Sequence, residues 1–102
     1  MIEKAQSRRI RVDIRHVLLQ TWDPIGIQDE PNAQDEYDAY IGDIFDLLVG
    51  DAPDSKILDY LFWAVHEHMG LDSSRREDML PAVAELRKID LSLIDNSQDS
   101  HL

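Results

Sequence analysis

Residues 54–70 read DSKILDYLFWAVHEHMG, and their apolar side chains recur at the spacing that forms one face of an α-helix. Asp54 or Ser55 can cap the first turn. Gly70 stands where a residue in the left-handed conformation often ends a helix. The stretch therefore predicts a helix with one buried face, formed by Ile57, Leu58, Leu61, Phe62, Val65 and Met69.

The sequence before residue 54 predicts two more helices. The first runs from about residue 2 to residue 21 and ends at Asp23-Pro24-Ile25-Gly26, because proline pushes the residue before it out of the helical region. The second runs from residue 33 or 34 to residue 49, with Asp35 and Glu36 in its first turn, where the helix dipole favours acids. The apolar faces are Ile10, Ile14, Val17, Leu18 and either Thr21 or Trp22 in the first helix, and Tyr37, Ile41, Ile44 and Leu48 in the second.

The sequence beyond residue 70 predicts a fourth helix with two alternative starts. Ser74 and Glu77 have the spacing of a capping box, but Pro81 would interrupt a helix that began at Ser74. Either this helix is kinked near Glu77, or it begins near Glu77 or Asp78 with Pro81 in its first turn. Its apolar face is Met79, Val83, Leu86 and either Ile89 or Asp90.

These four helices predict an all-α fold, because no stretch shows the strict alternation of a strand between hairpin turns. We expect a small bundle or an orthogonal array of four helices, with a long loop after the first. A chain of 102 residues fits a single domain, which we place at residues 1–93. Residues 94–102 are mostly polar and are expected to form a flexible tail.

The composition excludes several classes of function. Without cysteine there is no disulfide, no thiolate nucleophile and no cysteine-bound metal. A net charge of −11 disfavours nucleic acid as a partner, because a phosphate backbone would be repelled. No apolar run approaches the roughly 18 residues of a membrane span, and the first segment does not resemble a signal peptide. We therefore expect a cytoplasmic protein with no membrane partner.

The charge is divided unevenly along the chain. Residues 1–22 carry a balance of +3, residues 23–59 one of −10 and residues 60–102 one of −4. One interpretation is that the basic first segment lies beside the acidic middle segment and partly neutralises it within the monomer. The other is that the acidic segment is left free to bind a basic protein.

No motif in the sequence indicates catalysis or a bound metal. His66 and His68 are two residues apart, so on a helix they point in different directions and cannot hold one ion. The acids at Asp51, Asp54 and Asp59 do not follow the calcium-loop pattern. Phosphate-binding glycine loops and nucleophile elbows are absent from the sequence. We therefore expect no enzyme activity, no cofactor and no metal.

Three short blocks carry a resemblance to a known family. They are Trp22-Asp23-Pro24-Ile25-Gly26, then Asp35-Glu36-Tyr37-Asp38 with Tyr40, and finally Met69-Gly70-Leu71. Over residues 10–72 the chain resembles the YugE-like family of small bacterial helical proteins of unknown function. The resemblance implies an all-α fold and a bacterial origin, and it carries over no catalytic residue. Similar proteins also occur among immunity proteins that are paired with bacterial toxins.

The same blocks have a physical interpretation of their own. We expect Trp22 to plug the end of the first helix into the core, and Asp23 to accept backbone N–H bonds in the turn that follows. Tyr37 is expected to pack inward with its hydroxyl at the edge of the core. Asp35 and Glu36 would face the free N–H groups at the start of the second helix.

A binding surface is the functional alternative for the same part of the chain. The aromatic residues are explained equally well as core or as an interface patch beside the acids. The function that we predict is an acidic, non-catalytic immunity or inhibitor protein that covers a basic toxin such as a nuclease. The alternative is a bacterial helical module that pairs with a second copy through an apolar face. The predicted partner-binding residues are Asp29, Glu30, Asp35, Glu36, Asp38, Tyr60 and Trp63.

Overall fold

The computed structural model describes residues 4–71 and 75–91, and their regular structure is entirely helical. The α-helices are α1 (Lys4–Val17), α2 (Ile41–Val49), α3 (Asp54–Trp63) and α4 (Leu80–Arg87). The predicted all-α fold with four helices is confirmed. Within the described ranges no helix is long and apolar enough to cross a membrane.

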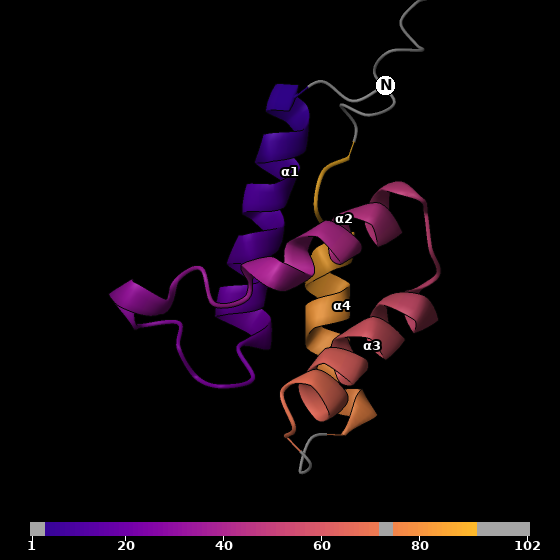
Figure 1. Ribbon diagram of the computed structural model, residues 1–102. Coiled ribbons are helices and arrows are strands. Elements are labelled where there is room, and N and C mark those ends of the chain that lie inside the picture. Colours follow the sequence, from indigo (N-terminus) through magenta and orange to yellow (C-terminus); the bar gives the residue numbers. More distant parts are fainter. Residues whose placement is uncertain (1–3, 72–74, 92–102) are drawn as a thin grey trace, which may run out of the picture.

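The helices form a crossed array rather than a parallel bundle (Figure 1). α1 packs against both α2 and α4, and α3 packs against α2 and α4 from the other side of the array. A long loop after α1 projects from this body before the chain enters α2 (Figure 1). The predicted apolar faces meet in one core, whose fully buried members include Ile10, Ile14, Leu18, Ile44, Ile57, Leu61, Val65 and Leu86.

The last turn of the first helical segment is wider than an α-helical turn. α1 ends at Val17, four residues before the predicted end of the helix at residue 21. Leu18–Trp22 continue the helical segment as a π-helical turn. Asp23 donates its N–H to the carbonyl of Leu18 over 2.8 Å and has a positive φ of 29°. The extra residue in this turn rotates Trp22 into the core and leaves Thr21 exposed.

The predicted start of the second helix is wrong. α2 begins at Ile41, and the residues before it form separate 3₁₀ turns at Pro31–Ala33 and Asp38–Tyr40. Asp35 and Glu36 therefore do not lie in a first α-helical turn. The physical reason is Tyr37, whose ring is buried and whose hydroxyl is bound to Asp23, so that its backbone takes φ −96° and ψ 7°.

The end of the third helical segment agrees with the sequence. Gly70 has a φ of +73°, which glycine adopts without the strain of a Cβ atom, and Leu71 donates its N–H to the carbonyl of Val65 over 3.0 Å. Before it, Ala64–His68 form a second π-helical turn. Ile57, Leu61 and Val65 are buried, whereas the other predicted face residues, Leu58, Phe62 and Met69, are partly buried.

The fourth helix begins late, as one of the two predicted alternatives requires. Arg76–Met79 form a 3₁₀ turn, and α4 starts at Leu80 with Pro81 in its first turn, where its missing N–H is not needed. The alternative of a kinked helix is wrong. The predicted cap at Ser74 and the predicted tail at residues 94–102 lie outside the described residues.

Burial separates the two tryptophans, which gives a test of the fold. Trp22 is 8% exposed and donates its Nε1–H to the sulfur of Met79 over 3.3 Å, whereas Trp63 is 46% exposed. We expect Trp22→Ala to lower the free energy of unfolding by about 3–5 kcal/mol. Trp63→Ala should lower it by about 1 kcal/mol, because only two ring contacts are lost. Urea denaturation of both variants measures this, and equal losses would contradict the packing.

Candidate functional site

The candidate site is the segment between α1 and α2, residues 23–40, which we call the acidic loop. The carboxylate of Asp23 organises its first half. Its Oδ1 accepts the backbone N–H of Ile27 over 2.7 Å, and its Oδ2 accepts the backbone N–H of Gln28 over 3.2 Å. The predicted role of Asp23 as an acceptor in this turn is confirmed. These bonds tie the residues that follow the proline to the end of the first helical segment.

Tyr37 closes the acidic loop from its other end. The ring is 1% exposed and packs against the ring of Trp22 with centroids 5.3 Å apart. Its hydroxyl donates to Asp23 Oδ1 over 2.9 Å and accepts the backbone N–H of Ile25 over 3.2 Å. The predicted inward packing of Tyr37 is confirmed, and the two ends of the loop are held together by one buried side chain.

The hydrogen bonds around Asp23 favour its ionised form. Burial by itself would raise the pKa of Asp23, but hydrogen bonds from Ile27, Tyr37 and Gln28 outweigh it and hold the pKa below its usual range. Burial raises the pKa of Tyr37 well above its usual value, and the bond to Asp23 adds to the increase. At neutral pH the carboxylate is therefore charged and the phenol is protonated.

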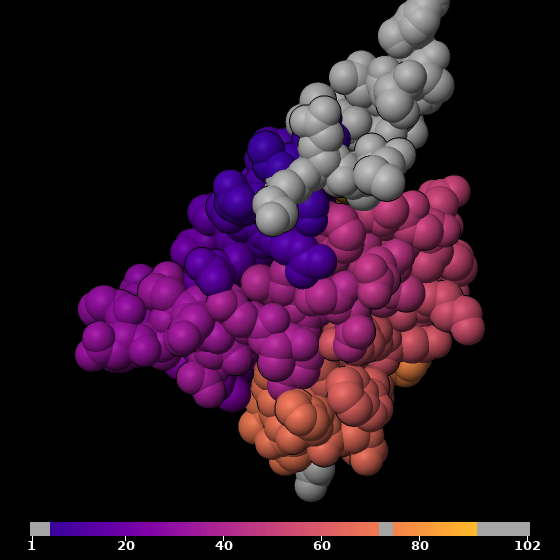
Figure 2. All heavy atoms as spheres, turned by 45° about the horizontal axis from the view of Figure 1, so that its top comes forward, coloured from indigo at the N-terminus to yellow at the C-terminus, as the bar shows by residue number. Residues whose placement is uncertain are grey.

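Four of the five predicted acids present their charge to solvent. Asp29, Glu30, Asp35 and Glu36 are exposed, and their carboxylates make no ion pair with any residue that the structure describes. Asp38 differs, because it is partly buried and accepts the Nε–H of Arg15 over 2.9 Å. Figure 2 shows the acidic loop, in purple, as a lobe that projects from the body of the molecule.

The two predicted aromatic residues lie on α3 and are not equivalent. Tyr60 is partly buried and donates its hydroxyl to Asp43 Oδ2 over 2.9 Å, and burial followed by this bond raises its pKa. Trp63 is exposed and lies beside the ring of Tyr60. Tyr60 also contacts Tyr40, which contacts Trp22, so one series of ring contacts joins α3 to the acidic loop.

The two histidines bind different neighbours. The ring of His66 stacks on Phe62 at 5.2 Å, and the ring of His68 stacks on Trp63 at 5.5 Å. His68 Nδ1 is 2.7 Å from the hydroxyl of Tyr40. Among residues 4–71 and 75–91, no group of three or more histidine or acidic side chains could hold a metal ion.

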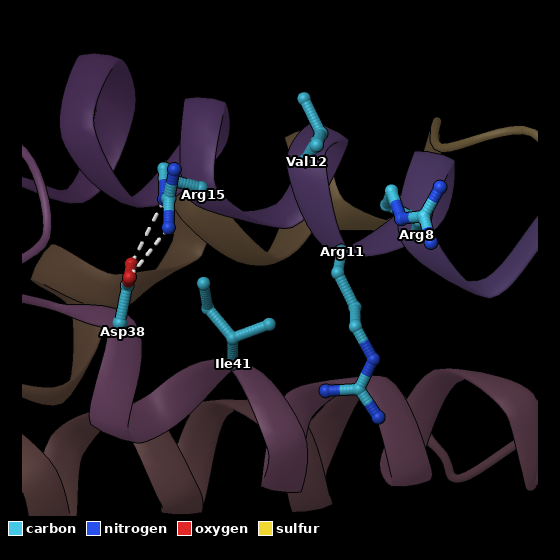
Figure 3. Close-up of a pocket in the computed structure, with 6 residues that line it drawn as sticks. All are labelled: Arg8, Arg11, Val12, Arg15, Asp38 and Ile41. Atoms are coloured by element: carbon cyan, nitrogen blue, oxygen red, sulfur yellow. Dashed lines mark hydrogen bonds and ion pairs between the residues drawn. The ribbon is translucent and has the colours of Figure 1, made fainter. Parts of the chain in front are cut away.

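A basic groove between α1 and α2 was missed by the prediction. Arg8, Arg11, Val12, Arg15, Asp38 and Ile41 line it (Figure 3). Arg15 pairs with Asp38 at one end, and this bond raises the pKa of Arg15. Arg11 lies over the ring of Phe45, 4.5 Å from its centre. The three arginines have the i, i+3, i+7 spacing of one helix face, a signal that was present in the sequence.

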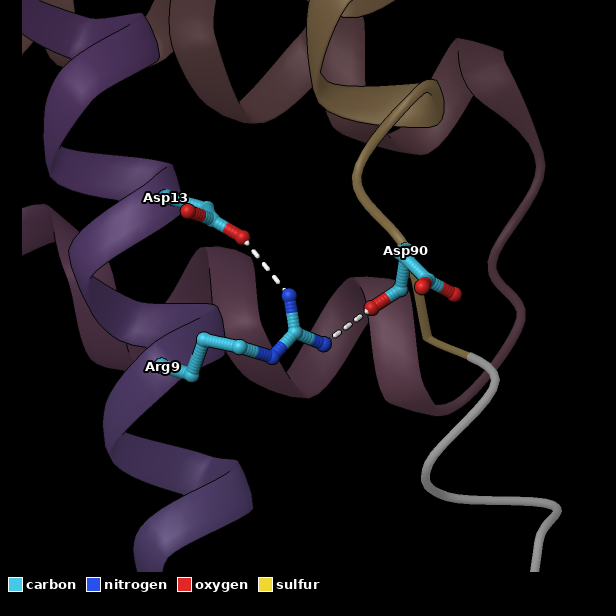
Figure 4. Close-up of polar contacts among 3 residues, drawn as sticks. All are labelled: Arg9, Asp13 and Asp90. Carbon is cyan, nitrogen blue, oxygen red and sulfur yellow. Dashed lines mark hydrogen bonds and ion pairs between the residues drawn. The ribbon is translucent and has the colours of Figure 1, made fainter.

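Arg9 faces a different part of the molecule and has a structural role. Its Nη1 donates to Asp13 over 3.0 Å, and its Nη2 donates to the carbonyl of Asp90, just beyond α4 (Figure 4). These bonds connect α1 to the end of α4. The basic first segment thus lies partly against the acidic middle segment, through Arg15, and partly against the end of the core.

No family model matches the chain, and searches of curated proteins and of solved structures found no similar protein. The resemblance to the YugE-like family therefore stays a prediction. Support for a function comes from the geometry of this chain, which places exposed acids on a hydrogen-bonded loop beside a basic groove.

The lowered pKa of Asp23 makes the acidic loop sensitive to acid. Asp23→Asn should lower the free energy of unfolding at pH 7 by about 1 kcal/mol, because a charged acceptor is lost. A group whose pKa is depressed on folding stabilises above its unfolded pKa of about 4, and this contribution is lost as the pH falls through the folded pKa. The difference between wild type and variant should therefore shrink below about pH 4. Denaturation at several pH values measures it, and a constant difference would contradict the shift.

The arrangement of the histidines predicts weak zinc binding. Titration with zinc at neutral pH should show neither a tight one-to-one complex nor a stabilisation that His68→Ala removes, because His66 and His68 face different neighbours. Calorimetry on the wild type and on His68→Ala measures this. A submicromolar complex that His68→Ala abolishes would refute the expectation.

Proposed function

We propose that this chain is a non-catalytic binding protein, which places its acidic loop against a basic surface of a partner protein. One observation carries the proposal. The carboxylates of Asp29, Glu30, Asp35 and Glu36 are exposed, and they lie on a backbone that Asp23 and Tyr37 hold in place. Fixed charges of one sign accelerate encounter with a partner of opposite charge and discriminate against other partners.

The partner that we favour is a basic bacterial toxin, with this chain as its immunity or inhibitor protein. A nuclease must present lysine and arginine side chains to bind phosphates. A loop that carries four exposed carboxylates is complementary to such a surface and would cover the residues that bind nucleic acid. The net charge of −11 supports a basic protein rather than a nucleic acid as the direct partner.

The aromatic residues of α3 contribute unequally to this proposal. Trp63 is exposed and offers a large side chain of the kind that anchors protein interfaces. Tyr60 is held by Asp43 and Tyr40, so it supports Trp63 more than it reaches a partner itself. We place recognition first on the acidic loop and second on Trp63.

We propose a non-catalytic function because of what causes the pKa shifts in this protein. Burial explains the raised pKa values of Tyr37, Tyr40 and Tyr60, whereas hydrogen bonds explain the lowered pKa of Asp23 and the raised pKa of Arg15. Each cause is a packing or loop-forming contact. Perturbed groups that serve catalysis instead converge on a cleft that can hold a substrate.

The alternative is a helical module that pairs with itself and has no toxin partner. The large apolar side chains exposed in the described ranges stand on four different parts of the fold: Val12 on α1, Ile25 in the acidic loop, Trp63 on α3 and Leu80 on α4. Their distribution gives little support to an apolar face. Self-association, where it occurs, is better explained by charge.

A matched pair of variants tests the proposal. The loop variant neutralises four acids, and the control variant neutralises four acids outside the loop, so both change the net charge equally. Each protein is immobilised and exposed to an extract of the native host. We expect a basic protein that wild type and control retain and the loop variant loses. The loop variant is Asp29→Asn, Glu30→Gln, Asp35→Asn and Glu36→Gln, and the control is Asp46→Asn, Asp51→Asn, Glu67→Gln and Glu77→Gln.

The kinetics of the recovered pair complete this test. Its association rate constant should fall about tenfold between about 0.05 M and 0.3 M salt, with less change in dissociation. The loop variant should associate more slowly, whereas its circular dichroism should match that of the control. A partner that binds the loop variant as fast as the wild type would refute recognition through the acidic loop.

A further inference from the structure

The acidic loop and the basic groove adjoin on the molecule, and together they form a surface with two charged ends. Asp38 belongs to the loop and also lines the groove (Figure 3). We propose that two copies of this chain associate through this surface, with the acidic loop of each copy against Arg8 and Arg11 of the other.

The positive end of the surface consists of Arg8 and Arg11. The guanidinium of Arg8 forms no hydrogen bond or ion pair with a described residue. Arg11 donates its Nε–H to the hydroxyl of Ser7 over 3.3 Å and stacks on Phe45, which leaves both Nη groups available. Arg15 does not add to the positive end, because its charge is matched by Asp38.

The negative end consists of Asp29, Glu30, Asp35 and Glu36, the exposed acids of the loop. The neutral pair Arg15–Asp38 stands between the two ends. Along the helix axis Arg8 lies about 10 Å and Arg11 about 6 Å from Arg15, so the positive charges lie on the side of the pair away from Asp38 and the loop. Figure 3 shows Arg8 at one end of the groove and the Arg15–Asp38 pair at the other.

A surface with one positive and one negative end is complementary to itself about a two-fold axis. Rotation by 180° places each end opposite the other end of the second copy, so both contacts form at once. The axis would pass near Arg15 and Asp38, where no net charge opposes approach. Val12, which is 56% exposed and lines the groove, adds an apolar contact close to that axis.

A second copy fits this surface better than a nucleic acid does. The groove offers the guanidinium of Arg8 and the two Nη groups of Arg11, while the chain as a whole carries −11 and repels a long phosphate backbone. The loop of a second copy brings four carboxylates to the groove and receives two arginines in return. At about 0.1 M salt the repulsion between two acidic copies is screened beyond roughly 10 Å, whereas pairs in contact still attract.

Sedimentation velocity of the protein alone tests the dimer, at concentrations from about 5 to 500 µM in about 0.1 M salt. Wild type should form a dimer. Its dissociation constant should rise at least tenfold in the groove variant, Arg8→Gln with Arg11→Gln, and at least tenfold in the loop variant defined above. The control for the groove, Lys56→Gln with Arg75→Gln, makes the same change in net charge on exposed residues elsewhere and should dimerise like wild type.

The loop variant separates this proposal from a simple effect of net charge. Neutralising four acids lowers the overall repulsion between copies, so net charge alone predicts stronger association. The proposal predicts weaker association, because the acids make the contact. A mixture of groove variant and loop variant should form a heterodimer, since the intact loop of one can dock in the intact groove of the other.

Four results would overturn this dimer. They are a wild type that stays monomeric over the whole range, a dimer that the groove variant leaves unchanged, a loop variant that associates as strongly as wild type or more strongly, and a mixture of the two variants that forms no heterodimer. The proposal does not rest on a toxin partner. A monomeric wild type that still binds a basic protein in a salt-dependent way would refute the dimer and leave the proposed function intact.

Discussion

The burial of Trp22 is the interaction on which the rest of the structure depends. Its ring contacts Tyr37 and Tyr40 near the end of the acidic loop, and its Nε1–H reaches Met79 before α4. Trp22 therefore joins the end of the first helical segment to two segments that are distant from it in the sequence. Burial of a large aromatic side chain stabilises by several kcal/mol, so these contacts fix where the segments lie. Asp23 is next in the chain, and the position of Trp22 sets where its carboxylate points.

The hydrogen bond between Tyr37 and Asp23 holds the acidic loop together against the repulsion among its own charges. Four exposed carboxylates in one loop repel one another, and a flexible loop would spread them apart. The bonds from Ile27, Gln28 and Tyr37 to Asp23 hold the backbone in place without using the exposed acids. The charges are thus available to a basic partner, and binding would relieve their repulsion.

The two proposals are linked by competition for the same loop. In the two proposals a basic partner and a second copy would both contact Asp29, Glu30, Asp35 and Glu36, so each would exclude the other. By mass action, dimerisation lowers the apparent affinity for the partner at high protein concentration and has no effect when the protein is dilute. The pattern of charges would also make binding specific. Arg8 and Arg11 lie near the loop and would repel a basic partner whose own positive charges face them.

The sequence by itself determined the elements that depend on local patterns. Apolar spacing identified the buried faces, and Gly70 marked the end of the third helical segment, because helix periodicity and backbone conformation are properties of neighbouring residues. The acceptor role of Asp23 was also predictable, since its backbone donors are four and five residues away. The excess of acids in residues 23–59 followed from composition, whereas composition left open whether these acids are exposed or neutralised by the basic first segment.

Only the tertiary structure decided the late start of α2, the pairing of Asp38 and the basic groove. Tyr37 bonds to Asp23 across 14 residues, and Arg15 bonds to Asp38 across 23. Such contacts select 3₁₀ turns where the local sequence also permits an α-helix, because the buried ring and its hydrogen bonds outweigh a weak helical preference. A groove likewise requires two helices to meet, and the spacing of arginines on one of them cannot tell which helix stands opposite.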